Sequence, residues 1–568
     1  MSKNVLTVRC LVIFALGLSA CTESPQSPGE LSADRIFVGD NILTMDDKFA
    51  NANAVAIRGD KIIWVGDLTQ WSGTATETIE LGRRTLVPGF IDAHGHLAFF
   101  ARTVNLANVA SPPVGTVATM ASLQETLRIY IREREIAPGQ WVVGMGYDDS
   151  LIEEQRHPDR DDLDAVSTDH PIALIHVSGH LAAANSMALE QAGIGADTPD
   201  PAGGVIRRRP DSSVPNGVLE ESATAPLRGL FMGTKGIPAE DIAQALRTYA
   251  SYGITTVQDG AASWQIHQML AEIAARNGLS LDVVVYPQAM AESFTIPDGV
   301  AVGVYHNRLK VGGVKLILDG SPQGKTAYLT SPYQVVPQGL SEDYRGYPAI
   351  PQESVNQRVE RFVIERVPML VHANGDAAAQ MLIDALELAS EQTPLGDHRT
   401  VMIHAQTVRE DQLDRMQQLG IVPSYFSAHT FFWGDWHRDS VLGIERASRI
   451  SPTASTLRRG MPFTVHNDAP IVPPDMIRLL WATVNRITRS GETLGEAQRI
   501  SALEAIRAVT ANAAFQYFEE HTKGSITPGK QADLVILSEN PVTVLPETIL
   551  EIRVVETISR GRTVYPTP

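Results

Sequence analysis

Eight short apolar runs constrain the fold of this 568-residue chain. They alternate with helical patterns, which predicts parallel β-strands joined by helical crossovers. Eight such strands are the number that closes a (β/α)8 barrel of the TIM type, which makes this an α/β chain. The expected strands end at His96, Asp259, Pro287, Asp319, His372, His404, Ser427 and Asp468.

The rest of the chain adds two features to a barrel predicted over residues 89–520. The gap after the first strand, about residues 100–245, is too long for one crossover, so we expect an insertion there. Residues 34–88 and 521–568 have short apolar runs broken by tight turns, typical of strands. Neither end can bury a face alone, which predicts one small β-sandwich built from both chain ends.

Residues 1–21 have the layout of a signal peptide, because a basic flank precedes an apolar run too short to span a bilayer. Its end, Leu18-Ser-Ala-Cys21, resembles a bacterial lipobox, which implies cleavage before Cys21 and lipid attachment to its thiol. Residues 22–33 are predicted to be a flexible tether. We therefore expect a lipid-anchored protein of the bacterial cell envelope. Thr22 favours the outer membrane, facing the periplasm, although an ordinary secreted protein is the alternative.

Composition limits the partners of the chain. Its net charge of -18 and isoelectric point near 5.3 argue against nucleic acid, which favours a basic face. The two cysteines, Cys10 and Cys21, both fall in the predicted leader or at its cleavage site. The mature chain is thus expected to have no internal disulfide and no cysteine metal ligand. The predicted membrane contact is the N-terminal lipid alone, and an oligomer is compatible with the sequence.

A His-Gly-His motif closes the first expected strand. Alternate residues of a strand point to the same side, so His94 and His96 can aim two imidazoles at one point, with the small Gly95 leaving room between them. Imidazole is a common ligand for zinc and similar ions, although such a pair often has no metal role. Barrel enzymes place their sites at the C-terminal strand ends. Further candidates for that face are Lys315, His372, His404 and Asp468.

These motifs resemble those of the amidohydrolase superfamily, and within it the YtcJ-like branch that includes N-substituted formamide deformylases. The resemblance runs from about residue 34 to the C-terminus. The matching pieces are Pro88-Gly-Phe-Ile-Asp-Ala-His-Gly-His, Asp319-Gly-Ser-Pro-Gln-Gly-Lys-Thr-Ala, His372-Ala-Asn-Gly-Asp, Asn467-Asp-Ala-Pro and Lys523-Gly-Ser-Ile-Thr-Pro-Gly-Lys-Gln-Ala-Asp-Leu.

The resemblance implies a divalent metal centre of one or two ions, with zinc expected. In binuclear relatives a carbamylated lysine bridges the metals, and Lys315 matches that position. The anionic carbamate and Asp468 would reduce the repulsion between two cations. A metal-activated hydroxide would attack the carbonyl, and Asp468 would carry the proton to the leaving nitrogen. The implied ligands are His94, His96, Lys315, His372, His404 and Asp468.

Four further residues are candidates for contact with the substrate. His180 lies in a family motif within the insertion, with a packing role equally open. His429 is expected to polarise the carbonyl or orient the substrate. Trp433 and the aromatic residues around it would form an apolar wall, unless they are plain packing. Gln323 is expected at the substrate or in a supporting hydrogen bond.

The sequence therefore predicts a hydrolase of a non-peptide C–N bond, most readily an N-acyl or N-formyl amide of a small molecule. A cyclic-amide or lactone hydrolase, a dipeptidase and a deaminase remain open, because all use the same centre. A lipid-anchored binding protein without catalysis is the alternative from another class, and the intact ligand set argues against it. The sequence assigns no role to His466 or Asn467.

Overall fold

The computed structural model describes residues 31–231, 236–337 and 339–567. The predicted signal peptide, Cys21 and most of the predicted tether lie outside these residues. The first strand, β1 (Ser32–Val38), begins at Ser32 rather than at residue 34. None of the helices in the described part of the chain combines the length and the hydropathy of a membrane span.

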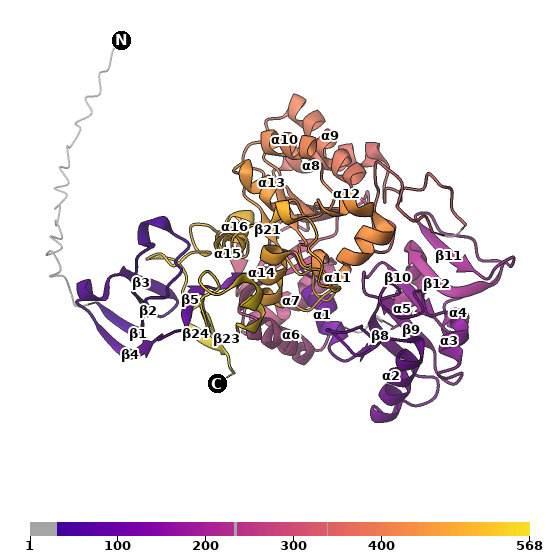
Figure 1. The fold of residues 1–568 in the computed structure, drawn as a ribbon, viewed down its shortest axis with the longest axis horizontal. Helices are drawn as coiled ribbons and strands as arrows, with labels where there is room; N and C mark the ends of the chain where they lie inside the picture. Colours follow the sequence, from indigo (N-terminus) through magenta and orange to yellow (C-terminus); the bar gives the residue numbers. More distant parts are fainter. Residues whose placement is uncertain (1–30, 232–235, 338, 568) are drawn as a thin grey trace, which may run out of the picture.

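A barrel of parallel strands forms the centre of the molecule (Figure 1). Its strands belong to two five-stranded sheets, and the first sheet also contains the short antiparallel pair β15 (Tyr305–His306) and β16 (Leu309–Val311). The sheets are joined where β16 continues into β17 (Val314–Ile317) across Gly312-Gly313. The backbone closes the barrel between the last and first strands, with Asp468 N 3.2 Å from His94 O. All eight expected strands are present: β6 (Phe90–Ile91), β13 (Ile254–Ala262), β14 (Asp282–Pro287), β17 (Val314–Ile317), β18 (Met369–Ala373), β19 (Val401–His404), β20 (Val422–Tyr425) and β21 (Thr464–Val465). The first strand ends at Ile91 rather than at His96, so His94 and His96 lie in the bend beyond it instead of alternating along a strand.

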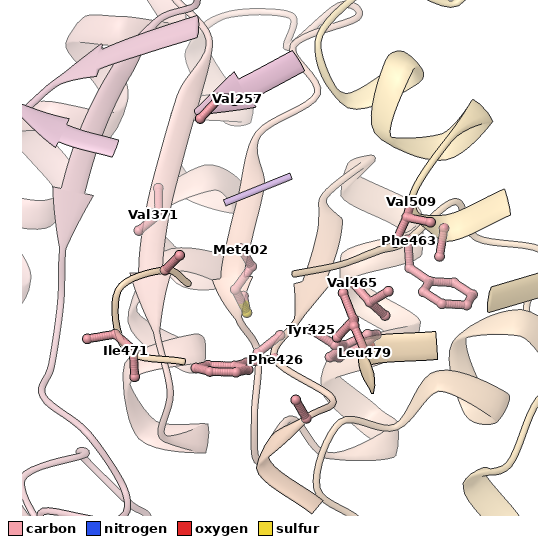
Figure 2. Packing of buried hydrophobic residues seen from close by; sticks show 14 of the residues in the cluster. Val257, Val371, Met402, Tyr425, Phe426, Phe463, Val465, Ile471, Leu479 and Val509 are labelled. Atoms are coloured by element: carbon pink, nitrogen blue, oxygen red, sulfur yellow. The ribbon is translucent and has the colours of Figure 1, made fainter. Parts of the chain in front are cut away.

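Apolar side chains on both faces of these strands explain why they lie inside. Every residue of β18 and β19 is buried, as expected for parallel strands covered by helices. Figure 2 shows part of this core, with Val371 and Met402 on these two paired strands. The covering helices are α1 (Leu97–Thr103), α6 (Ala239–Ser251), α7 (Trp264–Ala275), α8 (Gln352–Glu365), α9 (Asp376–Gln392), α10 (Glu410–Leu419), α11 (His429–Trp436), α12 (Gly443–Ala447), α13 (Thr453–Arg458), α14 (Met476–Asn485), α15 (Ala502–Ala508) and α16 (Ala511–Gln516).

Between β6 and β13 the chain forms a six-stranded sheet of its own, in the order β11-β12-β10-β9-β8-β7. In Figure 1 this sheet lies on the opposite side of the barrel from β1. It contacts α11 through Trp433, whose Nε1 donates to Asp148 Oδ2 at 2.7 Å. Its elements are β7 (Ala107–Asn108), β8 (Val142–Tyr147), β9 (Ile172–His176), β10 (Leu181–Ala184), β11 (Gly204–Arg208) and β12 (Pro215–Glu221), with α2 (Met120–Glu133), α3 (Arg160–Asp164), α4 (Ser186–Gln191) and α5 (Ala225–Phe231).

Two four-stranded sheets contain the remaining strands from both ends of the chain. They share a buried cluster that includes Phe37, Leu86 and Leu534. Antiparallel pairing of Val87 with Val535 joins segments far apart in the sequence. The strands are β2 (Ala54–Arg58), β3 (Lys61–Gly66) and β4 (Thr74–Glu80) beside β1, and β5 (Thr85–Pro88), β22 (Leu534–Leu537), β23 (Val554–Ser559) and β24 (Arg562–Tyr565) in the second sheet.

A buried ion-pair network fastens the start of β14 to the C-terminal segment. The carboxylate of Asp282 has no solvent exposure and lies 2.6 Å from Lys523 Nζ and 2.9 Å from Arg560 Nη2. Burial alone would raise the pKa of Asp282, but Lys523 and Arg560 outweigh it and lower that pKa. Lys523 of the Lys523-Gly-Ser motif therefore forms an ion pair at the N-terminal end of the barrel strands, opposite the polar strand ends.

We predict that Asp282→Asn strongly destabilises the protein, because it leaves buried cations without their main partner. Removing one member of a buried pair costs about 3–5 kcal/mol. The control is Glu365→Gln, which breaks a half-exposed pair with Arg361 within one helix and should cost less than about 1 kcal/mol. Urea unfolding of both variants measures the difference. Equal midpoints for the two variants would contradict this reading.

Candidate metal centre

The C-terminal strand ends bring His94, His404 and Asp468 together, with one ligand atom of each within 4.8 Å of the others. The Asp468 Oδ1 atom lies 3.5 Å from His94 Nε2 and 3.1 Å from His96 Nε2. Its Oδ2 lies 3.8 Å from His404 Nε2. One carboxylate is thus surrounded by imidazoles from the first and sixth barrel strands.

Lys315 and His372, the other two predicted ligands, lie next to these histidines. Lys315 is 1% exposed, and its Nζ lies 3.2 Å from His94 Nε2. Burial lowers the pKa of this lysine to about 7. The His372 ring packs against the His404 ring with centroids 4.5 Å apart, while its Nε2 lies 3.2 Å from Gly320 O. The same Nε2 lies 3.0 Å from Asn374 Nδ2.

Strand β13 orients the first two histidines. His94 Nδ1 lies 2.6 Å from Gln258 Oε1, and His96 Nδ1 is hydrogen-bonded to Gly260 O. Gln258 is itself fixed because its amide nitrogen donates to Ala93 O at 2.8 Å. Both imidazoles therefore carry their proton on Nδ1 and present the Nε2 lone pair to the centre. Burial lowers the pKa of His94 well below its ordinary value, which keeps this ring neutral.

His466, to which the sequence assigned no role, orients His404. Its Nε2 lies 3.2 Å from His404 Nδ1, and its Nδ1 lies 2.8 Å from Ser424 Oγ. Burial lowers the pKa of His466 to about 3, so this ring is neutral. It accepts the Nδ1 proton of His404 and so leaves His404 Nε2 free for a ligand bond. The signal was the spacing: His466 and Asp468 are two residues apart, like His94 and His96.

The backbone at the strand ends is unusual for residues other than glycine. His404 and Asp468 have φ values of +71° and +57°, a region that L-residues seldom adopt and that clusters at functional sites. Gly95 is also required, but not for the predicted reason. A Cβ at Gly95 would lie 2.5 Å from Asp92 Oδ2. The missing side chain thus makes room for a buried carboxylate rather than for the two imidazoles.

His180 lies at the edge of the centre. Its ring centroid is 5.7 Å from that of His372, and its Nδ1 is 2.7 Å from Glu221 Oε2. Burial alone would lower the pKa of His180, but the Glu221 carboxylate outweighs burial and raises it. The imidazole therefore favours the protonated form, with a proton on Nε2 that it can donate.

His429 and Trp433 lie on α11 in a packed aromatic group. His429 Nδ1 is 2.9 Å from His437 Nε2, and its ring is 4.6 Å from that of Trp433. Phe426 lies between His429 and His466, with centroids 4.5 and 5.4 Å away. Among the described residues, no hydrogen bond or ion pair joins His429 to the predicted ligands.

Gln323 faces a different space. It lines a polar cavity of about 340 Å³ together with His157, Arg207 and Lys325. Its backbone carbonyl accepts a hydrogen bond from Trp436 Nε1 at 3.1 Å. Within the part of the chain that the structure describes, no interaction brings the Gln323 side chain to the metal-ligand candidates.

A second cavity, of about 330 Å³, is lined by chain neighbours of two predicted ligands, although by none of the ligands themselves. Phe100, one turn after His96, and Ile471, three residues after Asp468, both line it. Phe432 and Trp433 also line it. A small apolar cavity next to a polar cluster is the usual form of a ligand site.

A rival cluster of Asp148, Asp149 and His176 also brings three ligand atoms within 4.8 Å. Its groups already have partners: Asp148 accepts from Trp433 Nε1 and Ser150, and Asp149 Oδ1 lies 2.9 Å from His176 Nε2. This cluster is therefore a closed hydrogen-bond network rather than an open metal site.

The residues at the strand ends fit a divalent ion. Asp468 Oδ1 is buried, and among the described residues it has no hydrogen-bond partner. Neutral imidazole nitrogens and a carboxylate oxygen are the donor set that zinc and similar ions prefer. An unpaired buried carboxylate is costly unless a cation compensates it. The chemistry of the donors thus supports a metal held by His94, His96, His404 and Asp468.

Comparison with known proteins identifies the class. The model for the amidohydrolase family matches residues 77–565, so the chain belongs to that family. It is 29% identical over 550 residues to the N-substituted formamide deformylase of Arthrobacter pascens, covering 93% of this chain and 97% of that protein. It is 25% identical to YtcJ of Bacillus subtilis strain 168 over 548 residues, covering 93% and 99%.

A crystal structure of an uncharacterised metal-dependent hydrolase from Pyrococcus horikoshii shares the fold, with a TM-score of 0.69 and 22% identity. It covers 90% of this chain and 99% of its own. The predicted resemblance to the amidohydrolase family is confirmed. The chain is a hydrolase acting on carbon–nitrogen bonds, from a family whose members bind a divalent metal.

The role of His466 yields a prediction about metal affinity. His466→Ala removes the acceptor that fixes the His404 tautomer, and loss of such a supporting group typically lowers metal affinity about 10- to 100-fold. His466→Gln, which keeps an acceptor oxygen, should lose less. Chelator competition measures the affinity, with His521→Ala as control because that side chain is 92% exposed. Unchanged affinity in His466→Ala would contradict the assignment.

Proposed function

We propose that this protein hydrolyses an N-acyl or N-formyl amide of a small molecule at a divalent metal centre. The observation that carries the proposal is Asp468 Oδ1, a buried oxygen without a hydrogen-bond partner among the described residues, beside His94 and His96. The 29% identical relative named as an N-substituted formamide deformylase supports an amide of this kind.

The proposed ion is zinc, one or two per chain, held by the six predicted ligands. Such an ion supplies Lewis acidity, lowering the pKa of water and polarising a carbonyl oxygen. We propose that Lys315 carries a carbamate. Only an uncharged amine reacts with carbon dioxide, and the burial of Lys315 beside His94 favours the uncharged form. The carbamate would add the negative charge that neutral histidines lack.

In the proposed reaction Asp468 moves the proton. Its Oδ2, the oxygen not assigned to the ion, takes a proton from the attacking water as the new carbon–oxygen bond forms, then delivers it to the leaving nitrogen as the carbon–nitrogen bond breaks. An acid and an amine leave. The Glu221 carboxylate favours the protonated form of His180. Its Nε2–H group donates a hydrogen bond to an oxygen of the substrate. His429 orients the substrate through the aromatic group around Trp433.

We propose that the six-stranded sheet is the predicted insertion of about residues 100–245, and that it completes the substrate cavity. Its residues Asn108 and Met145 line the cavity beside Ile471 of the barrel, which supports this. We also propose that residues 34–88 and 521–568 form one sandwich. The pairing of β5 with β22 supports that proposal.

We propose further that Cys21 carries a lipid that anchors the protein in the outer membrane, facing the periplasm. The leader sequence is the support for this proposal. Expressed in a Gram-negative host, the wild type and a Cys10→Ser control should both incorporate labelled palmitate and sediment with outer membranes. Cys21→Ser should lose the label and leave that fraction. Palmitate labelling of Cys21→Ser at the wild-type level would contradict the anchor.

We predict that Asp468→Asn lowers kcat by at least about a hundredfold while retaining most of its metal. Asparagine keeps the size and one ligating oxygen but cannot carry the proton, and general acid–base assistance is worth about 100- to 10,000-fold. His404→Asn, by contrast, should lower metal content together with the rate.

The assay for both variants is a panel of N-formyl amides, N-acyl amides, lactones and dipeptides, with metal content measured on the same samples. The proposal expects N-formyl or N-acyl amides to be the best substrates. Near wild-type turnover by Asp468→Asn with its metal in place would refute the proton transfer. A best substrate among the lactones or dipeptides would refute the amide assignment.

A further inference from the structure

The cavity of about 330 Å³ that Ile471 and Trp433 line also contains a cation that forms no ion pair among the described residues. Arg489 lines it, and among the described residues its guanidinium makes no hydrogen bond and no ion pair. Its recorded contacts are with the rings of Phe431 and Phe432, whose centroids are each 5.9 Å away. Burial lowers the pKa of Arg489, and the carboxylate of Asp148 offsets only part of this without forming an ion pair. An anion from outside that pairs directly with the guanidinium would offset more of the cost of burial.

The loop that carries Arg489 is held firmly on both sides of it. Thr488 Oγ1 donates to Asp435 Oδ1 at 2.9 Å, and the Ser490 backbone nitrogen donates to Asp435 Oδ2 at 3.0 Å. Asp435 is therefore occupied by the neighbours of Arg489 and by Arg438, 3.1 Å away. The guanidinium is presented to the cavity by a fixed loop, which reduces the entropy lost when it binds a ligand.

A second polar group in the same cavity lacks a partner. Ser111 is 5% exposed, and its Oγ has no hydrogen-bond partner within the described residues. Asp148 also lines the cavity, but its oxygens already accept from Trp433 and Ser150 and it forms no ion pair with Arg489 in the described chain. The cavity thus offers one cation and one hydroxyl without direct partners, while its carboxylate, Asp148, is already hydrogen-bonded to Trp433 and Ser150.

The remaining lining is mostly apolar, from Phe100, Val104, Leu106, Phe432, Trp433 and Ile471. Its volume lies at the small end of the range of about 300–1,000 Å³ for ligand pockets, which suits one ring or short chain. We propose that this cavity binds an apolar group that carries a carboxylate, with Arg489 pairing with the carboxylate and Ser111 donating to it. This inference rests on the proposed function in taking that group as part of the amide substrate.

The direct test is calorimetric binding of 4-phenylbutyrate and its neutral analogue 4-phenylbutanol to the metal-loaded full chain. We expect the carboxylate to bind at least about tenfold more tightly, the size expected for one hydrogen bond to a charged group. Arg489→Gln should abolish that preference, and Arg489→Lys should keep part of it. Arg478→Gln is the matched control, because Arg478 contacts the same Phe431 ring at 5.1 Å but is paired with Asp475. It should keep the full preference.

A carboxylate could also bind the metal, so the titrations are repeated after chelation. A preference that disappears on chelation and persists in Arg489→Gln would overturn the cavity assignment, as would equal binding of the two ligands by the wild type. Hydrolysis of N-formyl-phenylalanine and N-formyl-2-phenylethylamine separates this inference from the proposed function. Binding through Arg489 without hydrolysis of either amide supports the cavity and refutes the hydrolysis. Equal hydrolysis of both, unchanged in Arg489→Gln, supports the hydrolysis and refutes the cavity.

Discussion

The centre depends on one interaction: the carboxylate of Asp468 lies among imidazoles that already have a partner on their far side. His94 is bound to Gln258, and His404 to His466. Each ring therefore has one nitrogen committed and one directed inward, and burial keeps the rings neutral. Neutral donors around a buried anion leave a deficit of positive charge, which a divalent ion would supply.

In this barrel the polar candidate ligands lie at one end of the strands, and a stabilising ion-pair network lies at the other end. The polar residues lie at the C-terminal strand ends, where His404 and Asp468 adopt positive φ values that ordinary strand geometry would exclude. At the other end, the network of Asp282, Lys523 and Arg560 joins β14 to the C-terminal sheet. Strain at one end is tolerated because a close-packed core and buried ion pairs determine the rest of the backbone.

The sequence predicted the barrel strands and the residues at their ends, because strand patterning and a family motif are local signals. It could not predict partners that depend on how strands pair. The bond from Ser424 to His466 requires β20 and β21 to lie side by side, and the bond from Gln258 to His94 requires the same of β13 and β6. Nothing in the sequence pattern pointed to Arg489. It became a candidate because its guanidinium forms no hydrogen bond or ion pair among the described residues.

The measurement that tests this account most directly is a crystal structure of the active protein with anomalous diffraction at the zinc edge. The account predicts an anomalous peak about 2.0–2.2 Å from the inward nitrogens of His94 and His96 and from Asp468 Oδ1, the usual zinc distances. It also predicts density for a carboxylate on Lys315 Nζ. Fully active protein with no peak there, or with its peak at Asp149 and His176 instead, would contradict it.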